Sequence, residues 1–204
     1  MKRIFLWAVL MCPFLLQAQN SVPIIPQPVS LVTKEGSFVI DNKTSVKSAA
    51  GDAATLSVVH FFTAYVKKVS GIALPMGTAK GKSIQFIIAK TGDVGAEGYT
   101  ISVNPTQIIV QANTSKGLFY GAQSLLQTMP FVRTNEHVEI PCMEIKDYPR
   151  FQWRGLMLDV SRHFFAPELV KEFIDLLAMY KMNVFHWHLG HFFQLDLSTS
   201  SPPI

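Results

Sequence analysis

The sequence predicts an α+β domain, with a mostly antiparallel sheet and two helices, followed by a parallel β–α–β unit. Residues 21–145 contain short alternating stretches typical of strands and two amphipathic stretches typical of helices. Residues 153–189 contain a strand, a helix and a second strand in immediate succession. Between these regions, residues 142–154 break the regular patterns and indicate a linker, so we place the domain boundary near residue 145.

The beginning of the chain has the composition of an export signal. Lys2 and Arg3 form a basic start, and a short apolar core follows over residues 4–16. Ala18 then supplies a small residue suited to cleavage. We expect residues 1–18 to be a signal peptide, and the mature chain to reach the periplasm, the cell surface or the extracellular space. A membrane anchor is the alternative, but the apolar core is shorter than a membrane-spanning helix, and polar residues follow it.

The composition favours a folded chain with a sizeable core, because hydrophobic residues make up 49% and charged residues 16%. Loss of Lys2 and Arg3 with the signal peptide would reduce the 18 basic residues to 16, against 14 acidic ones. No basic patch is interleaved with aromatic residues, so we expect no nucleic acid partner, and no membrane association after cleavage. Cleavage would leave Cys142 as the one remaining cysteine, which excludes an internal disulfide.

The strands predicted in the first domain are short. Ser83–Ala89 alternates apolar and polar residues, as a half-buried strand does. Gly98–Val103 and Gln107–Val110 flank a turn signal, which predicts a hairpin. Nearer the N-terminus, Leu31–Thr33 and Ser37–Ile40 predict a second, shorter hairpin. Hairpins pair antiparallel strands, and this is why the sheet is predicted to be mostly antiparallel.

Two helices complete the first domain. The first follows Asp52, a suitable N-cap, and its apolar residues recur at helical spacing until Gly71. The second follows Thr114 or Ser115 and is stopped by Pro130. The domain contains no phosphate-binding glycine loop and no metal-ligand spacing, so we interpret it as a supporting domain.

Gly117 and Gly121 lie four residues apart in the second helix. This spacing also occurs at the dimer faces of membrane helices. The helix carries Lys116, Gln123 and Gln127, however, which do not suit a lipid environment. We therefore expect the two glycines to allow the helix to pack closely on the sheet.

The final region predicts a right-handed parallel crossover. Gly155–Val160 is a short apolar run with one carboxylate, Asp159, near its end. Pro167 suits the first turn of a helix, where its missing N–H costs nothing. Asn183 ends the helical pattern, and Val184–Leu189 is the second strand. The apolar face of the helix consists of Leu169, Phe173, Leu176, Leu177 and Tyr180.

Polar side chains gather where these two strands end. Barrels and open α/β sheets place their binding and catalytic groups at this end of the strands. The candidate functional residues are therefore Asp159, Ser161, Arg162, His163, His186 and His188. His186 and His188 alternate with Trp187, so both point to one side of their strand. Paired metal binding is an alternative, but two histidines without a third ligand are weak support for it, and we expect no metal.

Asp159 lies among apolar neighbours, so its carboxylate needs a partner. Arg162 and Arg154 are the candidates. A salt bridge that only fastens the strand is the competing interpretation of Asp159, and it applies more strongly to Arg154, which lies at the opposite end. Arg162 follows the strand directly, where its rigid fork of donors could bind sugar hydroxyls or a carboxylate.

Two long motifs in this region resemble a known family. YPRFQWRGLMLDVSRHFF, followed by KMNVFHWHL, resembles the first two barrel strands of the family-20 glycoside hydrolases, the β-N-acetylhexosaminidases. GLFYGAQSLLQ is similar to the end of that family's N-terminal α+β domain. The resemblance spans residues 22–189 and implies that residues 146–189 begin a (β/α)₈ catalytic barrel, incomplete in this chain.

The resemblance implies an exo-acting enzyme that removes terminal β-linked N-acetylglucosamine or N-acetylgalactosamine with retention of configuration. In such enzymes the acetamido oxygen of the substrate attacks the anomeric carbon, an Asp orients it, and a Glu protonates the leaving oxygen. Matched residue by residue, Arg162 and His188 are the substrate-binding positions, whereas Asp159 and Arg154 have structural roles. The implied partner is a glycan or glycoconjugate, and no cofactor is implied.

The resemblance ends after Leu189. The family continues with a small or polar residue and then usually Asp-Asp-Gln, whereas residues 190–204 form a divergent tail that begins GHFFQ. The family's catalytic Asp-Glu pair follows the fourth barrel strand, and these 204 residues contain two barrel strands. We therefore expect a truncation or frame shift near residue 190, no catalytic residue in this chain, and no activity of the chain alone.

Two other hypotheses remain. Residues 21–145 could be a non-catalytic carbohydrate-binding or interaction module, which would bind glycans without the barrel. Alternatively, the chain could be a remnant without function, whose open barrel strands would aggregate.

Overall fold

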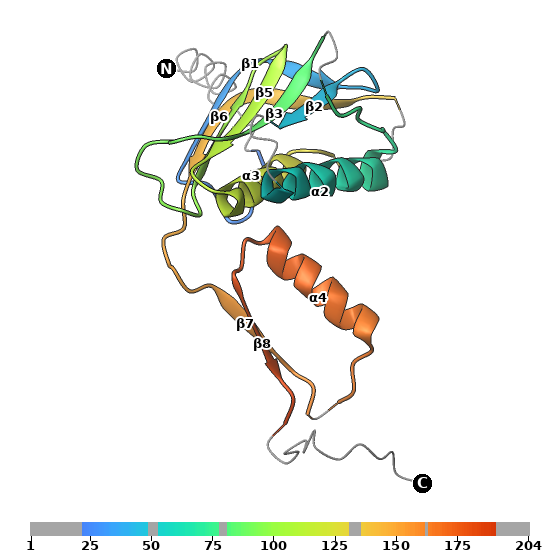
Figure 1. The fold of residues 1–204 in the computed structure, drawn as a ribbon, viewed down its shortest axis with the longest axis vertical. Coiled ribbons are helices and arrows are strands. Elements are labelled where there is room, and N and C mark those ends of the chain that lie inside the picture. Colours follow the sequence, from blue (N-terminus) through green and yellow to red (C-terminus); the bar gives the residue numbers. More distant parts are fainter. Residues whose placement is uncertain (1–21, 49–52, 78–80, 131–135, 162, 191–204) are drawn as a thin grey trace, which may run out of the picture.

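The structure is a computed structural model that describes residues 22–48, 53–77, 81–130, 136–161 and 163–190 (Figure 1). Four sequence predictions lie outside these residues: the signal peptide at 1–18, the N-cap at Asp52, the substrate-binding Arg162, and the divergent tail from residue 191 onward.

The described chain has two parts (Figure 1). The first is a six-stranded sheet with the helices α2 and α3 on one face, and the second is a parallel pair of strands with the helix α4. The predicted fold class is confirmed, because an α+β domain leads into a parallel β–α–β unit. Among the described residues, no helix has both the length and the apolar character that crossing a membrane requires.

The strand order of the first sheet is β1-β6-β4-β5-β3-β2. Its strands are β1 (Ser30–Ile40), β2 (Ser45–Ser48), β3 (Ser83–Ile88), β4 (Tyr99–Val103), β5 (Gln107–Ala112) and β6 (Val138–Asp147). The β1–β6, β6–β4 and β4–β5 pairs are antiparallel, whereas β5–β3 and β3–β2 are parallel. The sheet is therefore mixed, with antiparallel pairs in the majority.

The hairpin predicted near the N-terminus is wrong. Residues 30–40 form a single strand that pairs with β6 through residues 30–33 and 37–40, with an irregularity between Thr33 and Ser37. Gly36 lies there with a φ of 91°, a left-handed conformation that glycine adopts at little cost. The apparent turn is thus a bulge, which absorbs the extra residues while both halves of the strand keep the same partner.

The linker predicted at residues 142–154 is half strand, because β6 continues to Asp147. Along most of β6, buried and more exposed side chains alternate, as they do in a strand with one covered face. β6 pairs with β1 on one edge and with β4 on the other. Pro141 and the polar residues near the end of β6 conceal the strand in the sequence. Pairing with a strand on each edge stabilises β6 in spite of these residues.

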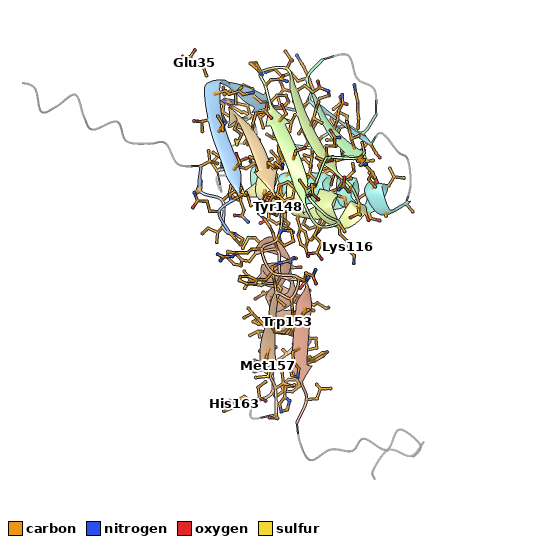
Figure 2. The ribbon with its side chains drawn as sticks, turned by 90° about the vertical axis from the view of Figure 1, so that its left-hand side faces the viewer. Glu35, Lys116, Tyr148, Trp153, Met157 and His163 are labelled. Carbon is orange, nitrogen blue, oxygen red and sulfur yellow. The ribbon has the colours of Figure 1, made fainter. Side chains whose placement is uncertain are left out.

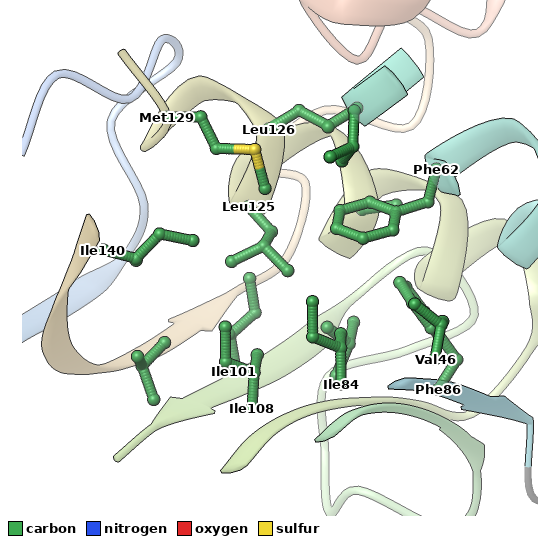
Figure 3. Close-up of a cluster of buried hydrophobic side chains, with 14 of the residues drawn as sticks. Val46, Phe62, Ile84, Phe86, Ile101, Ile108, Leu125, Leu126, Met129 and Ile140 are labelled. Carbon is green, nitrogen blue, oxygen red and sulfur yellow. The ribbon is translucent and has the colours of Figure 1, made fainter. Parts of the chain in front are cut away.

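The core lies between the sheet and the two helices α2 (Ala53–Ser70) and α3 (Ser115–Gln127) (Figure 3). Thr114 caps α3 as predicted, since its side chain accepts a hydrogen bond from the Gly117 amide. Phe62 of α2 meets Phe86 of β3 edge to face, with 5.3 Å between ring centroids. The fully buried core also includes Ile84, Ile101, Ile108, Leu118, Leu125 and Ile140.

The two glycines of α3 pack against the sheet, as predicted. A Cβ atom at Gly121 would lie 2.6 Å from Val110 Cγ1, and one at Gly117 would lie 2.4 Å from the carbonyl oxygen of Gly98. Both distances are too short for a real contact, so the absence of a side chain sets the distance between the helix and the strands.

Replacing Gly117 with alanine is expected to destabilise the domain, although alanine is the better helix former by about 1 kcal/mol. The clash with the Gly98 carbonyl involves backbone, and overpacking of this kind costs about 1–3 kcal/mol. We expect a net loss of about 1 kcal/mol in urea denaturation. Alanine at the exposed neighbour Lys116 is the control, which should change little. A stabilised Gly117→Ala variant would contradict the close packing.

The second part consists of β7 (Gly155–Asp159), α4 (Pro167–Met179) and β8 (Val184–His188). β7 and β8 are parallel, with Gly155 opposite Val184 and Asp159 opposite His188. Pro167 begins α4, as predicted. Figure 2 shows this unit extending away from the sheet domain, from Tyr148 at its base past Trp153 and Met157 to His163 at the far end.

Candidate functional site

Those of the predicted polar residues that the structure describes lie toward the carboxyl ends of β7 and β8, the ends farthest from the sheet domain (Figure 2). Asp159 stands directly opposite His188 in the parallel register. The carboxylate of Asp159 accepts hydrogen bonds from the amide of Ser161, at 2.9 Å, and from its hydroxyl. The amide of Val160 donates to the carbonyl of His188 at 3.0 Å, so the two strand ends are joined.

Asp159, His186 and His188 share one side of the two-stranded sheet. Strand alternation places Asp159 with His186 and His188, whose rings are 6.1 Å apart and nearly perpendicular. The opposite side carries Phe185, which contacts Phe173 of α4 at 5.7 Å between ring centroids. The polar side therefore faces away from the helix. In a β/α barrel, this is the side that faces the interior.

Arg154 lies at the other end of the unit and does not pair with Asp159. The prediction that Arg154 could be the partner of Asp159 is therefore wrong. Its guanidinium donates to the Glu97 carboxylate at 2.8 Å and to the Lys181 and Phe151 carbonyls, also at 2.8 Å. It also lies over the ring of Tyr120, 5.5 Å from the centroid. Arg154 thus connects the start of β7 to the sheet domain.

A second cation, Lys181, joins the start of β8 to the same domain. Its ammonium donates to the hydroxyl of Tyr99 at 2.8 Å and to the carboxylate of Asp147 at 3.1 Å. Tyr99 in turn donates to Asp147 at 2.7 Å and bonds to Ser124. We call the group of Glu97, Tyr99, Asp147, Arg154 and Lys181 the polar junction. Apart from Arg154, sequence reasoning missed its members.

Burial shifts the pKa values of two members of the polar junction, Tyr99 and Lys181. Desolvation raises the pKa of Tyr99 well above its ordinary value of 10.0, and the neighbouring Asp147 carboxylate raises it further. Desolvation also lowers the pKa of Lys181 from 10.5, although Asp147 opposes this shift. Both shifts have the same origin, because burial disfavours the charged form of each group.

In the part of the chain that the structure describes, no group of three His, Cys, Asp or Glu residues could hold a metal ion. The arrangement at the strand ends is instead one of hydrogen-bond donors and acceptors. A carboxylate, a hydroxyl and two imidazoles near the ends of these strands can orient a polar ligand.

An α+β domain that leads into parallel β–α–β structure, with polar side chains at the carboxyl ends of the strands, is the arrangement expected at the start of a β/α-barrel enzyme. Comparison with known families is specific. Residues 21–148 match domain 2 of glycosyl hydrolase family 20, and residues 151–195 match the catalytic domain of the same family. The chain belongs to glycosyl hydrolase family 20. The catalytic-domain match continues past Leu189, where the resemblance in the sequence was expected to end.

Among curated proteins, the chain is 32% identical over 176 residues to the β-hexosaminidase of Porphyromonas gingivalis, covering 83% of this chain and 23% of that protein. It is 31% identical over 173 residues to the β-N-acetylhexosaminidase of Cellulomonas fimi, covering 82% of this chain and 34% of that one. The chain thus spans about a quarter to a third of the length of these relatives.

Solved structures agree. The family-20 exo-β-N-acetylglucosaminidase of Vibrio harveyi in complex with N-acetylglucosamine matches with a TM-score of 0.74 and 32% identity, over 82% of this chain and 25% of that one. The family-20 β-N-acetylhexosaminidase of Streptomyces coelicolor matches with a TM-score of 0.74 and 30% identity, over 81% of this chain and 34% of that one.

Proposed function

We propose that these residues form the N-terminal domain and the first barrel segment of an exo-β-N-acetylhexosaminidase. The completed enzyme removes terminal N-acetylglucosamine or N-acetylgalactosamine from glycans by substrate-assisted, retaining catalysis. One observation carries the proposal: Asp159 and His188 stand side by side on the polar side of a parallel strand pair, at the end where barrels bind substrates. The family membership supplies the reaction class.

The proposed roles follow from position. His188, on the polar side of β8, contributes an imidazole to the hydrogen-bond network around the terminal sugar. Asp159, whose carboxylate accepts two hydrogen bonds from Ser161, shapes the turn that leads to Arg162. Arg162 lies outside the described residues, and we assign it to the sugar hydroxyls from its place in the motif.

The chemical step depends on the rest of the barrel. The orienting Asp and the protonating Glu of the family follow a fourth strand, whereas β7 and β8 correspond to the first two. The β–α–β unit also has little core of its own: of its described residues from 155 to 190, three are buried, namely Val170, Leu177 and Lys181. Large apolar side chains remain exposed on it, among them Leu156, Met157, Leu169, Ile174 and Trp187. Further barrel strands and helices would cover this apolar surface.

A polypeptide of these 204 residues alone is expected not to hydrolyse a chromogenic N-acetylglucosaminide above background. The same residues, joined after β8 to the remaining barrel of the Porphyromonas gingivalis relative, are expected to hydrolyse it. In that fusion, Arg162→Met should lower kcat/KM by about tenfold to a hundredfold, because a hydrogen bond to a charged group is worth about 1.5–3 kcal/mol. Lys171→Met, at an exposed lysine of α4 away from the strand ends, is the matched control and should change kcat/KM little.

The outcomes are distinct. Turnover by the 204 residues alone would contradict the need for further barrel strands. A soluble, folded fusion without turnover would contradict the proposed activity itself. Equal losses for the Arg162 and Lys171 variants would remove the assignment of Arg162 to the sugar.

The alternative of a glycan-binding module in the first domain finds no support in the structure. Sugar-binding surfaces commonly present an exposed aromatic ring. Among the described residues up to Asp147, the large exposed hydrophobic side chains are aliphatic or methionine: Ile25, Val29, Val32 and Met76.

A further inference from the structure

The end of α4 places a lysine where a glycine is the usual residue. After the cap residue Tyr180, the amide of Lys181 donates to the carbonyl of Ala178, and the amide of Met182 donates to that of Leu177. These two bonds define a Schellman motif, whose residue after the cap adopts the left-handed conformation. Lys181 has a φ of 59°, the one positive φ among the described residues other than glycine. A side chain is disfavoured in this conformation, and its presence calls for a reason.

The side chain of Lys181 supplies that reason. Its ammonium enters the sheet domain, where it donates to the hydroxyl of Tyr99 and to Oδ2 of Asp147. The side chain of Lys181 is 8% exposed and that of Asp147 13%, so the ion pair is nearly dry. Tyr99 accepts from Lys181 and gives its single proton to Asp147, so Ser124 donates to the remaining lone pair. Every polar group in the contact is satisfied.

The backbone of Lys181 connects this contact to the second cation. Its carbonyl accepts from Nε of Arg154, whose terminal nitrogen binds Glu97 of the sheet domain. The carbonyl of Arg154, in turn, accepts from the amides of Asn183 and Val184, where β8 begins. The amino-terminal ends of β7 and β8 are therefore held to each other and to the sheet domain through one continuous set of bonds.

The opposite ends of the same strands carry Asp159 and His188. Each strand has five residues, so the two ends are separated by about 15 Å. Because the β–α–β unit has little buried apolar surface, polar contacts fix its orientation at the base. Beside the polar junction, the Gln127 side chain donates to the Met179 carbonyl at 2.9 Å, and the Asn183 amide group donates to Glu97 at 3.4 Å.

We propose that Lys181 is a positioning residue: it occupies a glycine-type position so that its ammonium can lock the start of β8 to Asp147 and Tyr99, which orders β7 and β8 and sets the orientation of Asp159 and His188. This inference does not depend on the proposed glycosidase activity, because it concerns the ordering of the strands.

Lys181→Gly is the decisive variant, since glycine suits the left-handed position better than lysine does. If Lys181 served only to end α4, glycine would leave the strands as ordered as before. We expect instead that backbone amides of residues 184–188 exchange hydrogen faster by about tenfold to a hundredfold in the full chain, whereas amides of β3 to β5 keep their rates. Lys181→Met should have the same local effect. Lys171→Met, at an exposed lysine of the same helix, is the control.

Two further measurements separate positioning from general damage. The imidazole NMR signals of His188 and His186 should shift in both Lys181 variants, although these rings lie at the far end of the strand. Combining Lys181→Met with Asp147→Asn should accelerate exchange by less than the product of the single effects, because both substitutions break the same contact. Exchange in Lys181→Gly at the wild-type rate, or wild-type β8 amides without protection, would overturn the proposal.

Discussion

Replacing Phe62 with alanine is expected to cost about 3–5 kcal/mol of unfolding free energy, the largest loss that we predict for a single core position. Phe62 is fully buried where α2 meets the sheet, and its ring contacts Phe86 of β3. Truncation leaves a cavity between two layers that have no freedom to close it, because β3 is paired on both edges. Domains of this size are stable by about 5–15 kcal/mol, so a substantial fraction would be lost.

The adjacent Phe61 provides a matched control, since it has the same side chain on the same helix. Its ring is only partly buried, against Phe119 and Tyr65 at the helix surface. Alanine there is expected to cost about 1–2 kcal/mol. Urea denaturation followed by circular dichroism would compare the two variants, with a lower midpoint and an unchanged slope expected for Phe62→Ala. Equal losses at the two positions would show that the core is not centred between the sheet and α2.

The second large effect is a loss of stability at alkaline pH through Tyr99. Burial, reinforced by Asp147, raises the pKa of this phenol well above 10.0 in the folded chain, whereas the unfolded chain titrates near 10.0. Above pH 10 the unfolded state therefore binds fewer protons than the folded state, and stability falls as the pH rises. Tyr120, whose pKa burial also raises, contributes in the same direction.

Below about pH 10, Lys181 has the opposite effect on the pH dependence of stability. Its pKa is lowered from 10.5 in the folded chain, mainly by desolvation, so the unfolded chain binds more protons until the pH exceeds 10.5. Its contribution to stability therefore rises with pH towards that value. Stability that rises gently and then falls above about pH 10 is the expected profile of the native chain.

Tyr99→Phe tests this assignment. At neutral pH it should lose about 1–3 kcal/mol, because Asp147 and Lys181 each lose a hydrogen-bond partner. Above about pH 10 its stability should decline less steeply than that of the native chain, because one of the two raised phenol pKa values is removed. Urea midpoints measured from about pH 8 to about pH 11 would show both effects. Tyr180→Phe, at the exposed end of α4, should follow the native profile. A decline equally steep in Tyr99→Phe would contradict the role of this phenol.

Local signals in the sequence predicted much of this fold. Thr114 and Pro167 mark the starts of α3 and α4, and apolar spacing marks the buried face of α3. On α4 the predicted apolar face is largely uncovered, because Leu169, Leu176 and Tyr180 are exposed. Alternation predicted β3, and a turn signal predicted the hairpin of β4 and β5. Alternation also placed Asp159, His186 and His188 on one side of their strands. Each of these features arises from residues within about one turn or one strand of each other, and short-range sterics and hydrogen bonding determine them.

Features that depend on partners far apart in the chain were missed. β1 appeared to be a hairpin because Gly36 marks a turn, and only the long partner strand β6 shows that it is a bulge. β6 itself appeared to be a linker, since its stability comes from strands on both edges rather than from its own residues.

The sequence by itself therefore determined the family of this protein, the three helices and five of the strands that the structure describes, and the side of β8 on which the candidate substrate-binding residue His188 lies. The tertiary structure decided how the two parts are joined. Lys181 is 34 residues from Asp147 and 82 from Tyr99, and Arg154 is 57 from Glu97. No local pattern links such residues, because a buried charge is stabilised by whichever donors and acceptors the packed chain brings to it.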